Sequence, residues 1–118
     1  MDTTIEHLTD ATFADAVSEG ITVIDFWAAW CGPCRAMAPQ FERAARLRPQ
    51  YRFAKVDVDV EPELAGRFGI RSIPTLMVLR DGEPVATLAG LIPAEPLVEA
   101  LDRLAAAGPG TAAAREAA

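Results

Sequence analysis

The stretch V-I-D-F-W-A-A-W-C-G-P-C-R-A-M-A-P, residues 23–39, decides the fold of this chain. Its first half belongs to an apolar run, residues 21–29, and its second half has the composition of a helix. Between them lie Cys31 and Cys34, the only two cysteines of the protein. A C-x-x-C motif alone is a weak signal, but between a strand and a helix of a βαβ pattern it indicates a dithiol redox site.

The spacing of the motif suits thiol chemistry. The attacking species is a thiolate, and the unpaired N–H groups at the start of a helix favour negative charge. We expect Cys31 at that start, exposed and acidified, and Cys34 one turn inside the helix, within disulfide reach. Gly32 allows a tight bend, and Pro33 suits the first helical turn, where its missing N–H costs nothing.

Two other uses of the cysteine pair are less favoured. A structural disulfide normally closes a longer loop, because short loops stabilise least. A structural zinc site needs two further Cys or His ligands. The only histidine, His7, lies near the N-terminus, so no metal site is predicted.

Length and composition indicate one soluble domain, expected over residues 1–107. The chain has 118 residues, of which 51% are hydrophobic and 24% charged. No apolar run is long enough to span a bilayer, and the first residues show no secretory signal, so a cytoplasmic protein without membrane contact is expected. The net charge of −6 argues against nucleic-acid binding. Residues 108–118, rich in Ala, Gly and Pro, are expected to be a disordered tail.

The pattern along the chain predicts a β-α-β-α-β-α-β-β-α order. Strands are expected over residues 5–8, 21–27, 51–58, 75–79 and 85–89, and helices over residues 12–18, 34–47, 59–69 and 93–106. Asp59 is expected to cap the third helix. Pro84 cannot donate a hydrogen bond to a sheet, so the last strand is expected at an edge.

Asp25 interrupts the most apolar strand of the protein. A buried carboxylate is costly unless paired, and burial should raise its pKa. An acid with a purely structural role would be better placed on the surface. Asp25 is therefore a candidate proton acceptor near neutral pH.

Two segments resemble thioredoxins. Residues 23–39 look like the thioredoxin active-site segment, and F-G-I-R-S-I-P-T, residues 68–75, resembles the segment that carries the family's cis-proline. The similarity continues through residues 81–83 and Gly90 and covers roughly residues 3–106. It implies the α/β thioredoxin fold, a central mixed sheet flanked by helices on both faces. It also implies a protein-disulfide reductase acting by dithiol–disulfide exchange.

The resemblance also implies roles for single residues. Asp25 would help to deprotonate Cys34 through a water, and Lys55, the only lysine, would tune the site together with Gly32 and Pro33. For Lys55 the alternative is a partly buried salt bridge whose ammonium reaches solvent.

The Ile73–Pro74 bond would be cis and would place the backbone of Ile73 beside the cysteines, where an extended target segment could pair with it. Trp30 has an alternative role as a partly buried packing residue. The implied docking patch consists of Trp30, Gly32, Pro33, Ile73, Pro74, Gly90 and Leu91.

No bound cofactor is expected besides the redox-active disulfide. The implied partners are disulfide-containing target proteins and thioredoxin reductase, which would pass on electrons from NADPH, and the protein would be a monomer. The segment around Pro74 is closer to the thioredoxin-2 branch, which often carries an N-terminal zinc module that this chain lacks. Leu91 stands where many thioredoxins have a small residue, which makes the patch bulkier.

Two rival functions stay open at this point. An oxidase or isomerase of the same fold often carries histidine at a middle position of C-x-x-C, whereas Gly32-Pro33 is the pair found in reductases. A binding module within a larger complex, with incidental redox activity, is compatible with every residue of the sequence.

Overall fold

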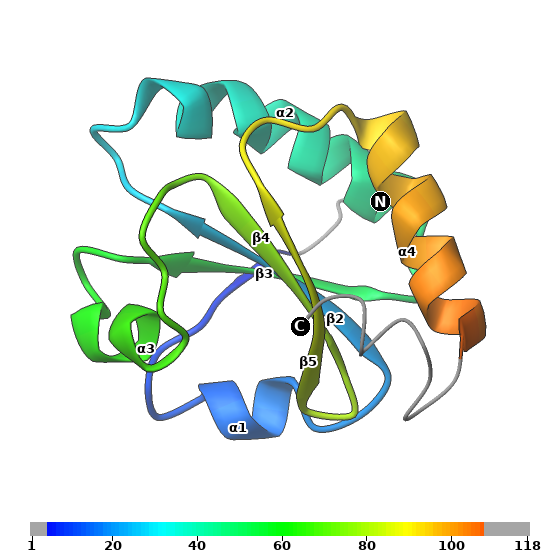
Figure 1. The fold of residues 1–118 in the computed structure, drawn as a ribbon, viewed down its shortest axis with the longest axis horizontal. Helices are drawn as coiled ribbons and strands as arrows, with labels where there is room; N and C mark the ends of the chain where they lie inside the picture. The colour runs from blue at the N-terminus through cyan, green and yellow to red at the C-terminus, as the bar shows by residue number, and fades with distance from the viewer. Residues whose placement is uncertain (1–4, 108–118) are drawn as a thin grey trace.

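The computed structural model describes residues 5–107; the predicted tail, residues 108–118, lies outside the described residues (Figure 1). Five strands form one mixed sheet in the order β1-β3-β2-β4-β5. The strands are β1 (Glu6–His7), β2 (Ile21–Trp27), β3 (Arg52–Asp57), β4 (Thr75–Arg80) and β5 (Glu83–Ala89). The helices are α1 (Phe13–Ala16), α2 (Gly32–Leu47), α3 (Pro62–Arg67) and α4 (Ala94–Ala107). The expected α/β architecture is confirmed.

Strand β2 is the centre of the sheet. It runs parallel to β3 and antiparallel to β4, and six of its seven residues are buried. Strands covered on both faces have near-continuous apolar sequences, which explains the run that starts at Ile21. The sheet therefore carries the residues after Trp27 out of its middle, at the carboxyl end of a parallel strand.

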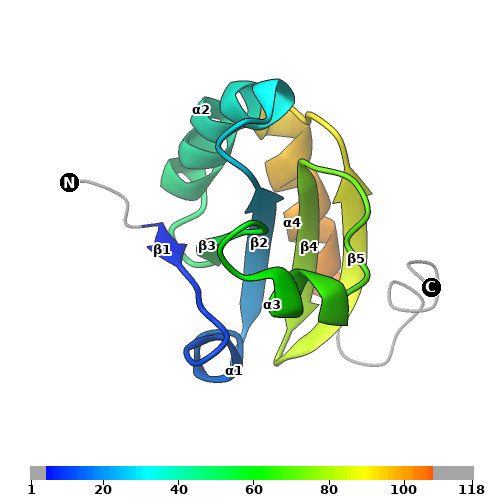
Figure 2. The same cartoon turned by 90° about the vertical axis from the view of Figure 1, so that its left-hand side faces the viewer.

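Helices cover both faces of the sheet, with α2 and α4 on one side and α1 and α3 on the other (Figures 1 and 2). Side chains of a strand alternate between the two faces. Val23 accordingly packs with Met37 and Phe41 of α2 and with Leu97 of α4. The other core combines residues of β2, α1 and α3, among them Ile24, Phe26, Phe13 and Leu64.

Helices α2 and α4 are tied together at two places. Near the start of α4, the Ala94 N–H donates to the Gln40 side chain of α2 at 2.9 Å. At the end of α2, Arg48 donates to the Asp102 carboxylate through Nε and Nη2, and the Tyr51 hydroxyl donates to the same carboxylate. The position of α2, and with it the position of the cysteines, is thus held by contacts along its length.

The edge position of β5 confirms the argument from Pro84. This proline pairs with Leu79 next to an irregularity in the register between Val78 and Leu79. At that end of the sheet, the Gly20 N–H donates to Asp81 Oδ1 at 2.7 Å and the Asp81 N–H donates back to the Gly20 carbonyl at 2.9 Å. Gly20 has a φ of 72°, which explains the glycine before β2.

Three local predictions are corrected. Strand β1 and helix α1 are shorter than expected, because only two and four residues, respectively, have the regular geometry. Helix α3 begins after Glu61, and Asp59 does not cap it. Asp59 lies in the preceding turn, where its carboxylate bonds a side chain of the site instead.

Candidate functional site

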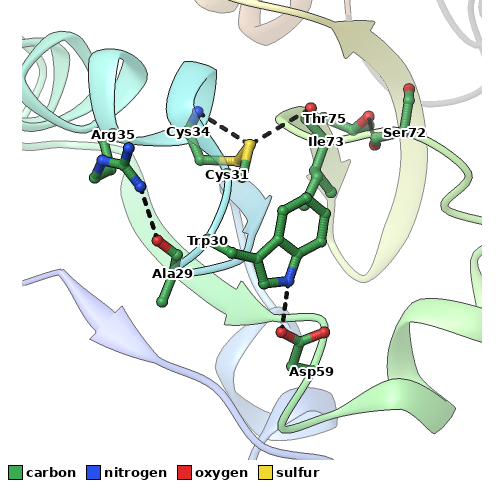
Figure 3. The surroundings of a disulfide bond; sticks show 9 residues. All are labelled: Ala29, Trp30, Cys31, Cys34, Arg35, Asp59, Ser72, Ile73 and Thr75. Carbon is green, nitrogen blue, oxygen red and sulfur yellow. Dashed lines mark hydrogen bonds between the residues drawn. A yellow bond between two sulfur atoms is a disulfide. The ribbon is translucent and has the colours of Figure 1, made fainter.

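The cysteines lie where β2 passes into α2. Cys31 is the residue before the helix, with extended backbone (φ −86°, ψ 112°), and Pro33 occupies the first turn as expected. The Cys31 N–H donates to the Ala28 carbonyl at 3.2 Å, which closes a tight turn after the strand. Cys31 and Cys34 form a disulfide with their Cα atoms 5.2 Å apart (Figure 3).

The start of α2 directs a backbone dipole at Cys31. The Cys34 N–H donates to the Cys31 Sγ at 3.2 Å. This N–H is one of the groups that a helix start leaves without a partner in the helix, so it can stabilise negative charge on the sulfur. In the dithiol form the same donor faces a Cys31 thiolate, which favours ionisation of that cysteine.

The expected exposure of Cys31 is wrong. Cys31 is only 4% exposed and Cys34 only 3%, so the two cysteines are almost equally buried. They pack with Ala28, Trp27, Val58 and Ile73. Burial follows from the loop around Ile73, which folds over the start of α2 and which the local sequence pattern does not position.

The Ile73–Pro74 bond is cis, as expected, and the Ile73 carbonyl oxygen lies 3.8 Å from the Cys31 Sγ. The loop is held on both sides of this bond. Thr75 Oγ1 donates to the Ser72 carbonyl at 2.6 Å, and the Gly90 N–H donates to the Pro74 carbonyl at 2.9 Å. The structure therefore places Ile73 beside Cys31 and joins Gly90 to Pro74.

Trp30 projects from the turn with 68% of its surface exposed. Its indole Nε1 donates to Asp59 Oδ2 at 2.8 Å (Figure 3). Leu91, which follows Gly90, is 54% exposed. Trp30 and Leu91 are thus two large apolar side chains that remain exposed, and their role as a docking surface stays a prediction.

A hollow of about 170 Å³ lies beside Trp30. Its lining consists of Trp30, Val58, Ile70, Arg71, Ser72 and Ile73. Sequence reasoning missed Val58, Ile70, Arg71 and Ser72, as well as the role of Asp59. Ile70, Arg71 and Ser72 could have been found from their position directly before Ile73 and Pro74 in the chain.

Asp25 lies beneath the site, fully buried in β2. Among residues 5–107, neither of its carboxylate oxygens has a hydrogen-bond partner. Burial raises the pKa of Asp25 from 3.8 to about 6, and the charge of Lys55 opposes that rise. Alternation along β2 puts Asp25 on the same face as Val23, which packs against α2, so the carboxyl group lies on the side of the cysteines.

Comparison with known proteins identifies the family. The sequence model of the family described as Thioredoxin matches residues 4–103. The chain belongs to the thioredoxin family. A thioredoxin of Listeria monocytogenes is 46% identical over 100 residues, which are 84% of this chain and 97% of the relative. A thioredoxin of Bacillus subtilis is 45% identical over 100 residues, or 84% of this chain and 96% of the relative.

Membership of the thioredoxin family, together with the Cys31–Cys34 pair, makes the chain a thiol–disulfide oxidoreductase that reduces disulfides in other proteins. The five-stranded sheet with helices on both faces is the thioredoxin fold. Among residues 5–107, no three His, Cys, Asp or Glu side chains lie close enough together to hold a metal ion. Over the same residues, no helix is long and apolar enough to cross a membrane.

Proposed function

We propose that the chain reduces target disulfides with Cys31 as the attacking residue and Cys34 as the resolving residue. The observation that carries the assignment is the hydrogen bond from the Cys34 N–H to the Cys31 Sγ at the start of α2. This N–H can stabilise negative charge on the Cys31 sulfur. Cys34 lies inside the helix and does not occupy the position at the helix start.

The exchange has two steps. The Cys31 thiolate attacks one sulfur of a target disulfide, a Cys31–target disulfide forms, and the other target sulfur leaves as a thiolate. Asp25 then accepts the proton of Cys34, whose thiolate attacks the Cys31 Sγ and releases the second target thiolate. Two electrons have passed to the target, and the Cys31–Cys34 disulfide of the structure is the oxidised product.

The apolar surface around the disulfide is the docking surface in this proposal. An extended target segment would lie between Trp30 and Leu91 and would pair with the backbone of Ile73, next to the attacking sulfur. Gly32, Pro33, Pro74 and Gly90 complete this surface. Lys55 tunes the pKa of Asp25, since its charge is the opposing influence on that group.

Thioredoxin reductase, with electrons from NADPH, is the proposed partner that restores the dithiol, and no cofactor is bound to the chain itself. We further propose a monomer, formed by residues 1–107 as one domain, that works in the cytoplasm, where reduced thiols are maintained. The acidic charge and the apolar docking surface support protein targets over nucleic acids.

The experiment that tests the proposal combines turnover with trapping. With thioredoxin reductase and NADPH supplied, the wild type is expected to reduce insulin. Cys34→Ser is expected to accumulate disulfides with target proteins, whereas Cys31→Ser is not. Equal trapping by the two variants would contradict the assignment, and a cysteine-free variant that still performs the cellular role would favour the binding-module alternative.

A further inference from the structure

We propose that Trp27 is a positioning residue: its indole ring holds the Lys55 ammonium group away from the Asp25 carboxyl group, so that Asp25 remains able to take up a proton. The inference rests on the proposed function in one respect, because the proton uptake serves the step assigned to Asp25. The contacts themselves are independent of that assignment.

The register of the sheet places Lys55 where it could bind either the Asp25 carboxylate or the Trp27 ring. Asp25 of β2 pairs directly with Lys55 of the parallel strand β3. Trp27 lies two residues beyond Asp25 in β2, and alternation along the strand places both side chains on one face. Phe53, two residues before Lys55, packs into the core beneath α2 that also holds Val23. Lys55 therefore extends on the same face as Asp25 and Trp27.

The ammonium group of Lys55 lies on the ring instead of on the carboxylate. Lys55 Nζ is 4.6 Å from the centroid of the Trp27 ring, within the range of a cation–π contact. Within the described residues 5–107, Asp25 and Lys55 do not form an ion pair at 4.0 Å or less, and both Asp25 oxygens lack hydrogen-bond partners. A carboxylate without partners and a cation within one side chain's reach would otherwise combine.

The Trp27 ring also has an aromatic neighbour. His7 of β1, which pairs with Lys55, meets the Trp27 ring edge-on with the centroids 6.2 Å apart. The remaining charged groups near this face are occupied elsewhere. Asp57 Oδ1 accepts the N–H groups of Asp59 and Val60, and Arg35 at the start of α2 donates to the Ala29 carbonyl. Lys55 is thus the charged group that opposes the effect of burial on Asp25.

The test is a double-mutant cycle read by carbon NMR titration of the Asp25 carboxyl group in the oxidised protein. Trp27→Leu removes the ring and frees Lys55, so the Asp25 pKa is expected to fall by about half a unit or more. In a Lys55→Met background, Trp27→Leu is expected to leave the Asp25 pKa unchanged. A fall of equal size in both backgrounds would mean that water reaches Asp25 through the space left by the indole, and this would overturn the proposal. An unchanged Asp25 pKa in both backgrounds would also overturn it.

Trp27→Phe covers the case in which Trp27→Leu does not fold. A phenyl ring binds a cation more weakly than an indole, so the Asp25 pKa is expected between those of the wild type and Trp27→Leu, again only while Lys55 is present. An unchanged pKa in folded Trp27→Phe would count against the proposal if Trp27→Leu cannot be measured.

A kinetic measurement separates positioning from general loosening. The pH at which release of a trapped target becomes half-maximal is expected to move down with the Asp25 pKa, whereas loosening would lower the rate at every pH. Because the NMR titration uses no target protein, its result stands whether or not the reductase proposal survives the Cys34→Ser trapping experiment.

Discussion

Trp30 and Asp59 are joined by a hydrogen bond of 2.8 Å from the indole Nε1 to a carboxylate oxygen. The bond spans 29 positions in the sequence and joins the turn before α2 to the turn after β3. Trp30 is otherwise little covered, so this contact fixes the orientation of an exposed indole in the turn next to Cys31. An oriented ring can dock a target without first losing rotational freedom on binding.

Asp59→Ala is therefore expected to slow reduction of protein targets. Loss of one hydrogen bond of about 0.5–1.5 kcal/mol corresponds to a decrease of kcat/KM of roughly 2- to 10-fold. Asp59→Asn keeps an oxygen acceptor and is the matched control, expected close to wild type. Insulin reduction at several concentrations checks both variants. Equal loss in the two would indicate that the charge of Asp59 matters and not its bond to Trp30.

Asp25→Asn is expected to stabilise the fold at high pH and to slow release of the trapped target. The folded-state pKa of Asp25, about 6, lies above its ordinary value of 3.8. Ionisation of Asp25 therefore favours the unfolded chain. The free energy of unfolding of the wild type is highest below the unfolded pKa, and the contribution of the protonated Asp25 is lost as pH rises through about 6. The advantage of Asn over Asp should grow by about 3 kcal/mol across this range.

Urea unfolding of wild type and Asp25→Asn at pH 4 and pH 8 measures that difference. A constant difference between the two proteins at both pH values would contradict a raised pKa. Stopped-flow measurement of release should show a slower second step in Asp25→Asn with an unchanged first step, since the residue is assigned only to deprotonation of Cys34.

Pro33→His is expected to make the protein more oxidising. An imidazolium in the first turn of α2 would stabilise the Cys31 thiolate, which favours the dithiol over the disulfide. The expected rise in reduction potential is roughly 10–40 mV. Equilibration with glutathione buffers measures it. Pro33→Gln is the uncharged control, and the rise should be larger at pH 6 than at pH 8, because the imidazole loses its charge between them.

Asp102→Ala is expected to lower the melting temperature at neutral pH. Hydrogen bonds from Arg48 and then Tyr51 hold the pKa of the Asp102 carboxyl below its ordinary value. Its stabilising effect is present above the unfolded pKa and is lost as pH falls through the lower folded pKa. Thermal unfolding should thus distinguish the variant from wild type at pH 7 and less so in strong acid. Glu99→Ala, an equal change of charge at an exposed position of α4, should have little effect at either pH.

The sequence predicted the framework of the fold better than its small elements. Strands β2 and β4 and the long helices were predicted to within about two residues, because each combines a clear apolar pattern with a glycine or proline at its boundary. Helix α1 and strand β1 have too few residues for periodicity to define their ends. Asp59 was expected to cap α3, since a local pattern cannot show that Trp30 competes for its carboxylate.

The same distinction applies to the site. Cys31 and Cys34 stand out in the sequence as a C-x-x-C motif between a strand and a helix, and Asp25 stands out because it interrupts an apolar strand. The burial of Cys31 and the contact between Lys55 and Trp27 depend on which strands are neighbours and on how the loop at Ile73 folds back. Such contacts arise between distant segments and leave no local pattern.

The burial of the disulfide has a consequence for its kinetics. Only 4% of Cys31 and 3% of Cys34 is accessible, and access governs how fast a free thiol can attack a disulfide. The rate at which small thiols in solution attack this disulfide is therefore expected to be low. In the proposed docking mode, a protein that binds against Trp30 and Leu91 would hold its own sulfur beside the pair. The fold thereby shields the pair from the surrounding thiol pool, and the proposed docking surface would admit partners that carry a matching surface.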